Sequence, residues 1–407
     1  MPGEGHGAPG FRRPTATGSA GEVLLAFTRL GITSFGGPIA HIGYFRAEFV
    51  ARRGWLTEQA YADLVALCQF LPGPASSQVG FSLGLMRAGY LGGLAAWCGF
   101  TLPSAIALVL FAMGASTLHG AAGTGLLHGL KLVAVAIVAQ AVLGMARSLC
   151  PDKRRAAIAL ASLLLMTAAP GSLGQIGAIV LGGIAGLIAC RDEPAKIGDG
   201  EIMPITRGMG VVFLALFAGL LALSFLPGGH GARALFAAFY RAGALVFGGG
   251  HVVLPLLRDA VVTPGWVSDN AFLAGYGAAQ AVPGPLFTFA AYLGTIANAG
   301  PGGVAGAALA LAGIFIPGLL ALMGSLPFWH ALRAETSARA AMAGINAAVV
   351  GLLGAALYDP VWTSAVGSRA DFALAAIGFV LLVLWRAAPL AVVLLSAAAG
   401  IGLGIAG

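Results

Sequence analysis

Two kinds of glycine-containing break interrupt apolar segments of this sequence, and each kind occurs twice. Phe35-Gly36-Gly37-Pro38 and Phe247-Gly248-Gly249-Gly250 are the first kind, and Pro72-Gly73-Pro74 and Pro283-Gly284-Pro285 are the second. A helix that restarts inside a bilayer after such a break exposes free backbone N–H groups and the positive end of its dipole. The four breaks therefore predict an anion-binding site.

Neutral hydrogen-bond donors lie close to these breaks and suit a tetrahedral oxyanion. The alternative is that the glycines and prolines only permit close packing or a kink. The predicted binding residues, glycines of the breaks included, are Ser34, Gly36, Gly37, His41, Gln69, Gly73, Ser76, Ser77, Gln78, Gly248, Gly249, His251, Gln280, Gly284 and Thr288.

Basic residues also occur inside the apolar segments. Arg29 and Arg241 occupy equal places in the two halves of the chain, as do Arg46 and Arg258. A charge within lipid is a functional candidate by default, and a guanidinium matches the edge of an oxyanion. We predict that Arg29 and Arg241 bind the anion, whereas Arg46 and Arg258 have the alternative of extending to the membrane surface. Lys131 is a further charge within an apolar segment and a secondary candidate.

Carboxylates are few near the breaks. Glu48, Asp63 and Asp259 are the candidate proton acceptors if transport is coupled to protons. Glu58 and Asp269 fit better in the first turns of capped helices. The four cysteines show no ligand spacing, and there is no P-loop, nucleophile elbow or H-E-x-x-H motif, so the sequence predicts no metal, no cofactor and no catalysis.

The composition is that of a polytopic membrane protein. Of the 407 residues, 58% are hydrophobic and 9% charged, and the mean hydropathy is +0.91. Soluble domains carry nearer a quarter charged residues. The net charge of +7 comes mainly from short loops between apolar runs, which indicates topology signals rather than contacts with nucleic acid.

Four apolar segments are too long for one straight span and contain a break: 22–50, 57–88, 234–262 and 268–297. Half of such a segment is about 15 residues, or roughly 22 Å as a helix. Each segment is therefore either a re-entrant hairpin or one broken helix, and the sequence does not separate these. Unbroken candidate spans lie near 90–117, 126–147, 154–169, 171–190, 208–226, 301–327, 337–358, 371–385 and 388–406.

The two halves align with each other. Residues 27–46 share seven identities with 239–258, and after a one-residue gap Trp55 to Tyr61 faces Trp266 to Phe272 with conservative differences. The two Pro-Gly-Pro breaks then align as well. An internal duplication explains this agreement.

Each broken segment counts as two membrane crossings if it is a hairpin and as one if it is a broken helix. In both cases the number of crossings between equivalent points of the two halves is odd, so the halves should be inverted. Basic residues at Arg52-Arg53 and Lys153 to Arg155 have no basic counterparts in the second half, in agreement with inversion. The predicted fold class is an all-α polytopic membrane protein with two inverted-topology repeats and broken or re-entrant helices near the midplane. The predicted domains are a disordered N-terminal tail (1–20), a first transmembrane repeat (21–190), a cytoplasmic linker (191–207), a linking transmembrane helix (208–233) and a second transmembrane repeat (234–407).

At these motifs the chain resembles the long, two-domain form of the chromate ion transporter family. The resemblance rests on Phe35 to His41, on Leu71 to Pro74 with Gln78, and on the second-half counterparts, and it covers residues 20–407. It implies export of chromate by a secondary carrier of the bacterial inner membrane. The positions of the basic loops place the N-terminus in the cytoplasm and the C-terminus in the periplasm.

The sequence therefore predicts that a dianion binds at the helix restarts, is neutralised by Arg29 and Arg241, and is exposed alternately as the two halves rock. The expected partners are a small oxyanion, chromate or sulfate, and the lipid bilayer, with a homodimer left open. A carrier for sulfate or another oxyanion has the same architecture, and a membrane redox enzyme acting on chromate is an alternative of another class.

Overall fold

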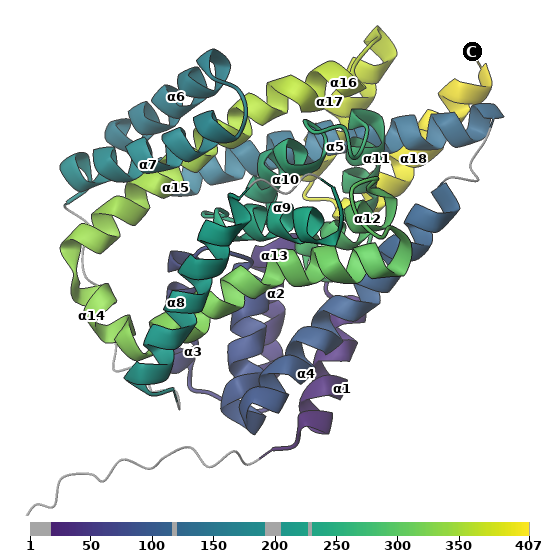
Figure 1. Cartoon of the computed structure of the whole chain (residues 1–407). Helices are drawn as coiled ribbons and strands as arrows, with labels where there is room; N and C mark the ends of the chain where they lie inside the picture. Colours follow the sequence, from purple (N-terminus) through teal and green to yellow (C-terminus); the bar gives the residue numbers. More distant parts are fainter. Residues whose placement is uncertain (1–17, 116–119, 192–204, 227–229, 407) are drawn as a thin grey trace, which may run out of the picture.

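The computed structural model describes residues 18–115, 120–191, 205–226 and 230–406, and all the regular elements in these ranges are helices (Figure 1). The all-α prediction is confirmed. The predicted tail up to residue 17 and the predicted linker from 192 to 204 lie outside the described residues.

The first broken segment folds back on itself as a hairpin. Helix α1 (Ala20–Thr33) leads to the break, and α2 (Gly37–Phe45) with the π-helical turn η1 (Arg46–Arg52) returns from it. The Phe27 ring on α1 stacks on the Phe49 ring on η1 with centroids 4.7 Å apart. A single broken helix would separate these rings by roughly 30 Å at 1.5 Å per residue. The hairpin form is therefore the one that this chain adopts.

The second broken segment is also a hairpin. Helix α3 (Glu58–Phe70) leads to the Pro-Gly-Pro break and α4 (Ala75–Ala115) leads away. Helix α4 has non-helical backbone at Ala88 and Gly89, so its first part returns to the level where α3 began and its second part departs as a separate span.

Ion pairs hold the open ends of these two hairpins together. Glu22 at the start of α1 pairs with Arg87 at 3.2 Å and lies 3.6 Å from Arg53. The Arg87 guanidinium lies 5.2 Å from the centre of the Trp55 ring. Glu48 accepts hydrogen bonds from Arg53 and from the neighbouring arginine at position 52. Glu48, a predicted proton acceptor, is thus a member of a structural network.

The second half repeats this arrangement. Tyr292 near the end of one hairpin donates to the Ala271 carbonyl near its start at 3.0 Å. The Asn298 N–H donates to the Trp266 carbonyl at 3.1 Å. The elements are α9 (Ala232–Ala244), η2 (Gly250–Val252) and α10 (Val253–Val261), then α11 (Asp269–Ala279), η3 (Leu286–Thr288) and α12 (Phe289–Ile296).

The remaining helices follow the predicted spans closely, and five of the described helices are long and apolar enough to cross a membrane. The short elements η4, α14, η5 and α16 are additions that the sequence did not predict. The helices are α5 (Gly120–Leu149), α6 (Lys153–Ala168), α7 (Ser172–Ala189), α8 (Arg207–Ser224), α13 (Gly303–Ser325), η4 (Leu326–Phe328), α14 (Trp329–Ala334), α15 (Thr336–Ala356), η5 (Leu357–Trp362), α16 (Thr363–Ala365), α17 (Arg369–Val383) and α18 (Pro389–Ala406).

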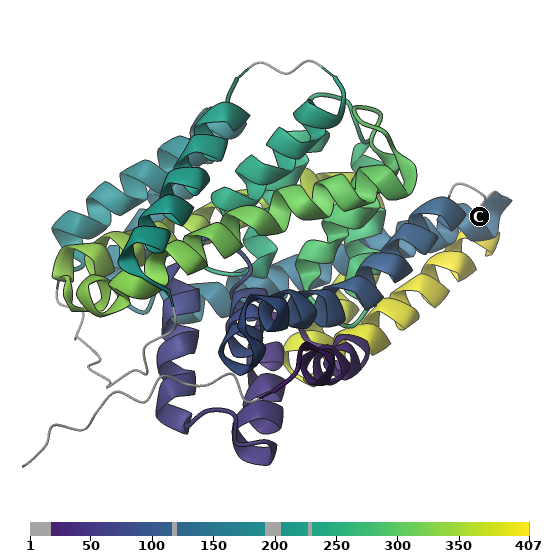
Figure 2. The same ribbon diagram turned by 60° about the horizontal axis from the view of Figure 1, so that its bottom comes forward.

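The long helices of each half pack against the other half. Helix α5 packs along α18 and α17, and α15 packs along α7 and α6; Figures 1 and 2 show α5 and α18 side by side. The close approach depends on small residues, because a Cβ at Gly129 would overlap the Ser396 carbonyl and one at Gly344 would overlap the Gly182 carbonyl. Equivalent elements thus make reciprocal contacts, whereas the inverted orientation stays a prediction.

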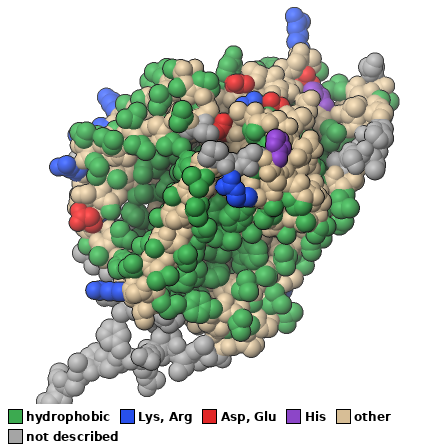
Figure 3. All heavy atoms as spheres, viewed as in Figure 1, with side chains coloured by type: hydrophobic (Ala, Val, Ile, Leu, Met, Phe, Trp, Pro, Cys, Tyr) green, Lys and Arg blue, Asp and Glu red, His purple; other side chains and the backbone are tan. Residues whose placement is uncertain are grey.

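The outside of the helices carries the lipid-facing surface. Hydrophobic side chains cover much of the face in Figure 3, with few charged ones among them. Val211, Val212, Leu216 and Leu223 of α8 are each about half or more exposed. A soluble monomer rarely exposes so continuous an apolar surface. The chain is a multi-pass membrane protein.

Candidate functional site

The four breaks meet inside the protein. The Gly73 N–H donates to the Val246 carbonyl at 2.8 Å, and the Gly284 N–H donates to the Ser34 carbonyl at 2.9 Å. Gly73 aligns with Gly284, and Ser34 aligns with Val246. The Pro-Gly-Pro break of each half therefore hydrogen-bonds the glycine break of the other half, in a reciprocal pair.

A contact between equivalent positions lies at the middle of this arrangement. Pro38 and Gly250 align with each other, and a Cβ at Gly250 would lie 3.1 Å from Cγ of Pro38. A two-fold relation between two copies of one unit brings equivalent residues together in this way. The contact and the reciprocal bonds are therefore those expected of two halves related by an approximate two-fold axis.

Glycine is required at both Pro-Gly-Pro breaks by conformation and by space. Gly73 has φ +109° and Gly284 has φ +98°, which L side chains rarely adopt. A Cβ at Gly73 would lie 2.8 Å from the Cα of Gly318, and one at Gly284 would lie 2.9 Å from the Ser104 hydroxyl. The two breaks are therefore close-packed points as well as helix interruptions.

Three helical elements that restart at the breaks lack a side-chain cap. Among the described residues, no side chain caps α2 after Gly36, η2 after Gly249 or η3 after Pro285. The first N–H groups of a helix need a partner outside the helix. Water or an anion is the expected partner at these positions.

Ser34 and His41 are buried polar residues beside the first glycine break. Ser34 is 1% exposed and His41 0%, and the Ser34 hydroxyl has no hydrogen-bond partner among the described residues. The His41 ring nitrogens form no hydrogen bond of ordinary geometry there, although the ring interacts with the Ser34 backbone. The ring is edge-on to Phe100, with centroids 5.1 Å apart. An unpaired buried polar group costs about 1–3 kcal/mol, so these groups are candidates for contact with an ion.

Further unpaired polar atoms belong to residues around the breaks. Gln78 donates to the Pro72 and Gly318 carbonyls at 2.9 and 2.8 Å, which leaves its side-chain oxygen free. Thr101, next to Phe100, is completely buried with an unpaired hydroxyl. The sequence prediction missed Thr101, although a polar residue two positions before a proline in an apolar span is a usable signal. The unpaired buried groups here also include Ser77 Oγ and Gln280 Nε2.

The polar groups are unequally divided between the halves. Apolar side chains stand in the second half where the first half has donors. The aligned pairs are Ser34 and Val246, His41 and Val253, and Gln78 and Phe289. The first half therefore supplies most of the polar side chains around the breaks, although both halves contribute backbone N–H and C=O groups.

The structure does not bring the predicted anion-binding arginines to the breaks. Arg29 is exposed on α1, on the side opposite to Phe27 and Gly31, which face α4. Arg241 donates to the Ser224 carbonyl at the end of α8, and its guanidinium lies 5.7 Å from the centre of the Phe225 ring. Helix α9 thus directs Arg241 away from the breaks, and neither guanidinium points toward them in this structure.

Arg46 and Arg258 make equivalent ion pairs at the hairpin ends. Arg46 pairs with Glu58 at 2.9 Å and Arg258 pairs with Asp269 at 2.9 Å. Both acidic residues occupy the first turn of a helix whose N-cap hydroxyl accepts from the backbone, as the sequence predicted. Each ion pair therefore joins the end of a hairpin that contains a glycine break to the start of the following hairpin, which contains the Pro-Gly-Pro break.

Other predicted residues have local roles or stand apart. His251 pairs with the Tyr276 hydroxyl at 2.7 Å, and Thr288 donates to the Pro285 carbonyl at 2.7 Å. Asp259 accepts from the Thr263 hydroxyl at 3.3 Å. The remaining predicted residues divide by burial: Ser76 is buried, Asp63 is half-buried, and Gln69 is exposed at the end of α3.

Comparison with known proteins places the chain in a family. The model of the chromate transporter family matches residues 21–187 and again 233–401. The chain belongs to the chromate transporter family. The two matches correspond to the two halves that contribute the breaks.

Named relatives of this chromate transporter family member cover most of its length. The chromate transport protein of Pseudomonas aeruginosa is 29% identical over 83% of this chain and 80% of its own length. The chromate transport protein of Cupriavidus metallidurans is 25% identical over 82% of this chain and 80% of its own length. An uncharacterized transporter of Methanocaldococcus jannaschii is 24% identical over 82% of this chain. No solved structure matches significantly.

Proposed function

We propose that this protein is a secondary transporter that exports chromate across the bacterial inner membrane by alternating access. The observation that carries the proposal is the meeting of four breaks, two from each half, through the reciprocal bonds Gly73 to Val246 and Gly284 to Ser34. Transport sites formed at interrupted helices between two repeats are a recurrent solution in secondary carriers. The names of the family and its relatives supply the substrate.

The anion is held in this proposal by neutral donors rather than by a guanidinium. Restarting helices direct N–H groups and positive dipole ends at it, and Ser34 and His41 donate from the first half. A tetrahedral oxyanion accepts hydrogen bonds in several directions at once. Neutral donors release a dianion more easily than a buried cation does, because opposite charges attract strongly at low dielectric.

The proposed orientation follows the basic residues at the helix ends. The two halves are inverted repeats in this proposal. The network around Arg53 and Arg87 and the basic start of α6 then lie on the cytoplasmic side. The N-terminus is cytoplasmic and the C-terminus periplasmic. Export of a dianion from a cell that is negative inside is favoured by about 2.3 kcal/mol per charge per 100 mV.

Everted membrane vesicles test the proposed function. Vesicles from cells that make this protein are expected to accumulate labelled chromate in their lumen with saturable kinetics, and vesicles from cells without it are not. A positive potential inside the vesicles should accelerate accumulation because chromate carries negative charge. Equal accumulation in both kinds of vesicle would refute the proposal.

The same vesicles distinguish the alternatives. Equal competition by sulfate would redefine the protein as a general carrier for tetrahedral dianions. Conversion of chromate to a reduced chromium species without accumulation in the lumen would favour the redox enzyme. Accumulated chromium that remains chromate, with weak competition by sulfate, supports the specific exporter.

A further inference from the structure

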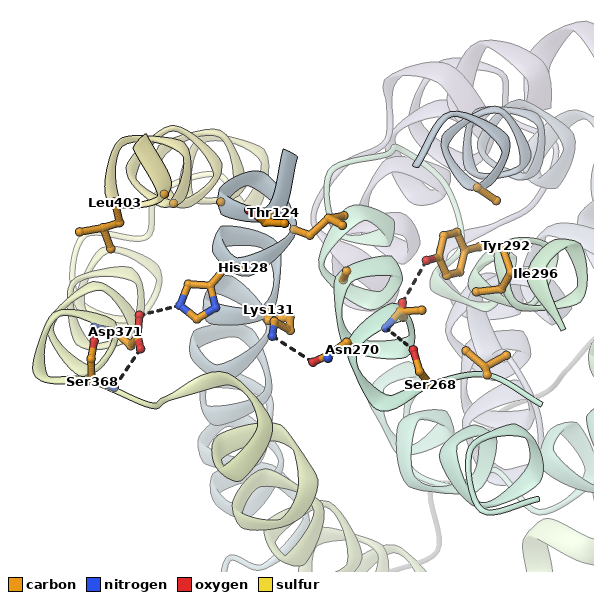
Figure 4. Close-up of a pocket in the computed structure, with 18 of the residues that line it drawn as sticks. Thr124, His128, Lys131, Ser268, Asn270, Tyr292, Ile296, Ser368, Asp371 and Leu403 are labelled. Atoms are coloured by element: carbon orange, nitrogen blue, oxygen red, sulfur yellow. Dashed lines mark hydrogen bonds and ion pairs between the residues drawn. The ribbon is translucent and has the colours of Figure 1, made fainter. Parts of the chain in front are cut away.

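A cavity of about 990 Å³ lies away from the breaks, between α5, α11, α17 and α18. None of the glycines or prolines of the four breaks lines it. Its wall is mainly apolar, and a few polar groups converge on it, which is the usual composition of a small-molecule site. Figure 4 shows His128 and Lys131 projecting from α5, with Asn270 on α11.

Lys131 lines this cavity and forms no ion pair with a carboxylate within the part of the chain that the structure describes. Its ammonium donates to the Asn270 side-chain oxygen at 3.1 Å (Figure 4). Asp371 acts on Lys131 electrostatically, but its own oxygens accept from His128 at 2.6 Å and from the N–H of Ser368 at 2.9 Å. Among the described residues, Lys131 thus makes its hydrogen bond to an amide and feels a carboxylate only at longer range. A cation of this kind within an apolar helix is a functional candidate.

We propose that Lys131 and Asn270 form a second oxyanion site, which the anion occupies between the breaks and the periplasm. This inference rests on the proposed function and its orientation. The oxyanion accepts from the Lys131 ammonium and from the Asn270 amide NH₂, and Lys131 exchanges its contact with the amide oxygen for one with the anion. Chromate or sulfate has the charge and the size to enter.

Helix α11 links the two sites. Asn270 stands in its first turn, and Gln280 caps its other end beside the Pro-Gly-Pro break. Ten residues of helix separate them by about 15 Å. Tyr276, between these ends, bonds His251 of the other hairpin at 2.7 Å. Helix α11 therefore spans the distance between the Pro-Gly-Pro break and the pair of Lys131 and Asn270.

The second half of the chain has no charged counterpart of Lys131. Gly129 on α5 and Gly344 on α15 make equivalent close contacts with the opposite half, so these two glycines correspond to each other. Lys131 and Asn346 each stand two residues after their glycine and therefore correspond as well. Asn346 is uncharged, and its side-chain oxygen lies near Gly248 rather than in this cavity. The duplicated halves thus differ in charge at the position where an anion would leave or enter.

The substitution Asn270→Asp tests the site at almost constant volume. It places a carboxylate against Lys131, which neutralises the ammonium, and it keeps α11 intact because acidic residues suit the first turn of a helix. We expect the KM for chromate accumulation in everted vesicles to rise at least about fivefold, as it should in Lys131→Met. Lys131→Arg should restore most of the affinity because the charge is kept.

The control is Gln59→Glu, which changes the aligned, exposed position of the first half outside this cavity and should leave the KM unchanged. An unchanged KM in both Asn270→Asp and Lys131→Met, with normal flux by the natural chain, would overturn this inference alone. Absence of saturable flux by the natural chain would overturn the proposed function and this inference with it.

Discussion

Replacing Gly73 with alanine is expected to abolish chromate flux. The backbone at this position has φ +109°, which costs a non-glycine residue about 1–2 kcal/mol. The added methyl would also lie 2.8 Å from the Gly318 Cα on α13, where only backbone can yield. Relief of this overlap must move the Pro-Gly-Pro break and weaken the bond from the Gly73 N–H to Val246. The initial rate of chromate accumulation in everted vesicles measures the effect.

Gly54→Ala is the matched control for Gly73→Ala. Gly54 also has a positive φ, +59°, but a Cβ there would meet no atom within 4 Å. Its substitution should cost only the conformational strain and leave most of the flux. If Gly73→Ala and Gly54→Ala retain equal flux at equal amounts of membrane protein, the close approach at Gly73 has no role in the transport site.

Ser34→Ala is expected to reduce chromate flux strongly without lowering thermal stability. The Ser34 hydroxyl is buried and unpaired among the described residues, so its removal relieves a desolvation penalty rather than breaking a bond. A hydrogen bond to a charged ligand contributes about 1.5–3 kcal/mol, and its loss weakens binding roughly 10- to 100-fold. His41→Leu, a substitution of similar volume, should behave in the same way.

Ser224→Ala should show the opposite pattern. The Ser224 hydroxyl is buried on α8 and donates to the Leu221 carbonyl at 2.6 Å. Its loss removes a net stabilisation of about 0.5–1.5 kcal/mol and no contact with the breaks. Unfolding midpoints in detergent and flux measured on the same variants separate the two patterns. A clear fall in the midpoint for Ser34→Ala, with normal flux, would show that its hydroxyl is structural.

The repeats and their interruptions were predictable because they depend on local chemistry. Glycine and proline stop a helix wherever they lie, so the breaks at Gly36 and Gly73 and their counterparts stand where the sequence indicated. Thr57 caps its helix as predicted, since a cap involves only neighbouring backbone. The choice between hairpin and broken helix depended on long-range contacts such as that between Phe27 and Phe49.

The directions of the charged side chains within the apolar segments were not predictable from spacing. A helix in a membrane protein can be apolar on every side, so its pattern does not indicate which side meets protein. Arg29 was assigned to the anion site, yet the side of α1 that contacts α4 is set by Phe27 and Gly31. The lack of a partner for the Ser34 hydroxyl among the described residues is likewise a property of the packed structure. The sequence showed that Ser34 lies near a break but did not show that its hydroxyl remains unpaired.

The position of bound chromium tests the central claim most directly. Anomalous data collected on both sides of the chromium absorption edge, from crystals grown with chromate, distinguish chromium from the sulfur atoms without any assumption about mechanism. The account predicts the strongest peak beside the four breaks, about 3 Å from the Ser34 hydroxyl or the His41 ring, as hydrogen bonding requires. A strongest peak anywhere else on the protein would contradict it.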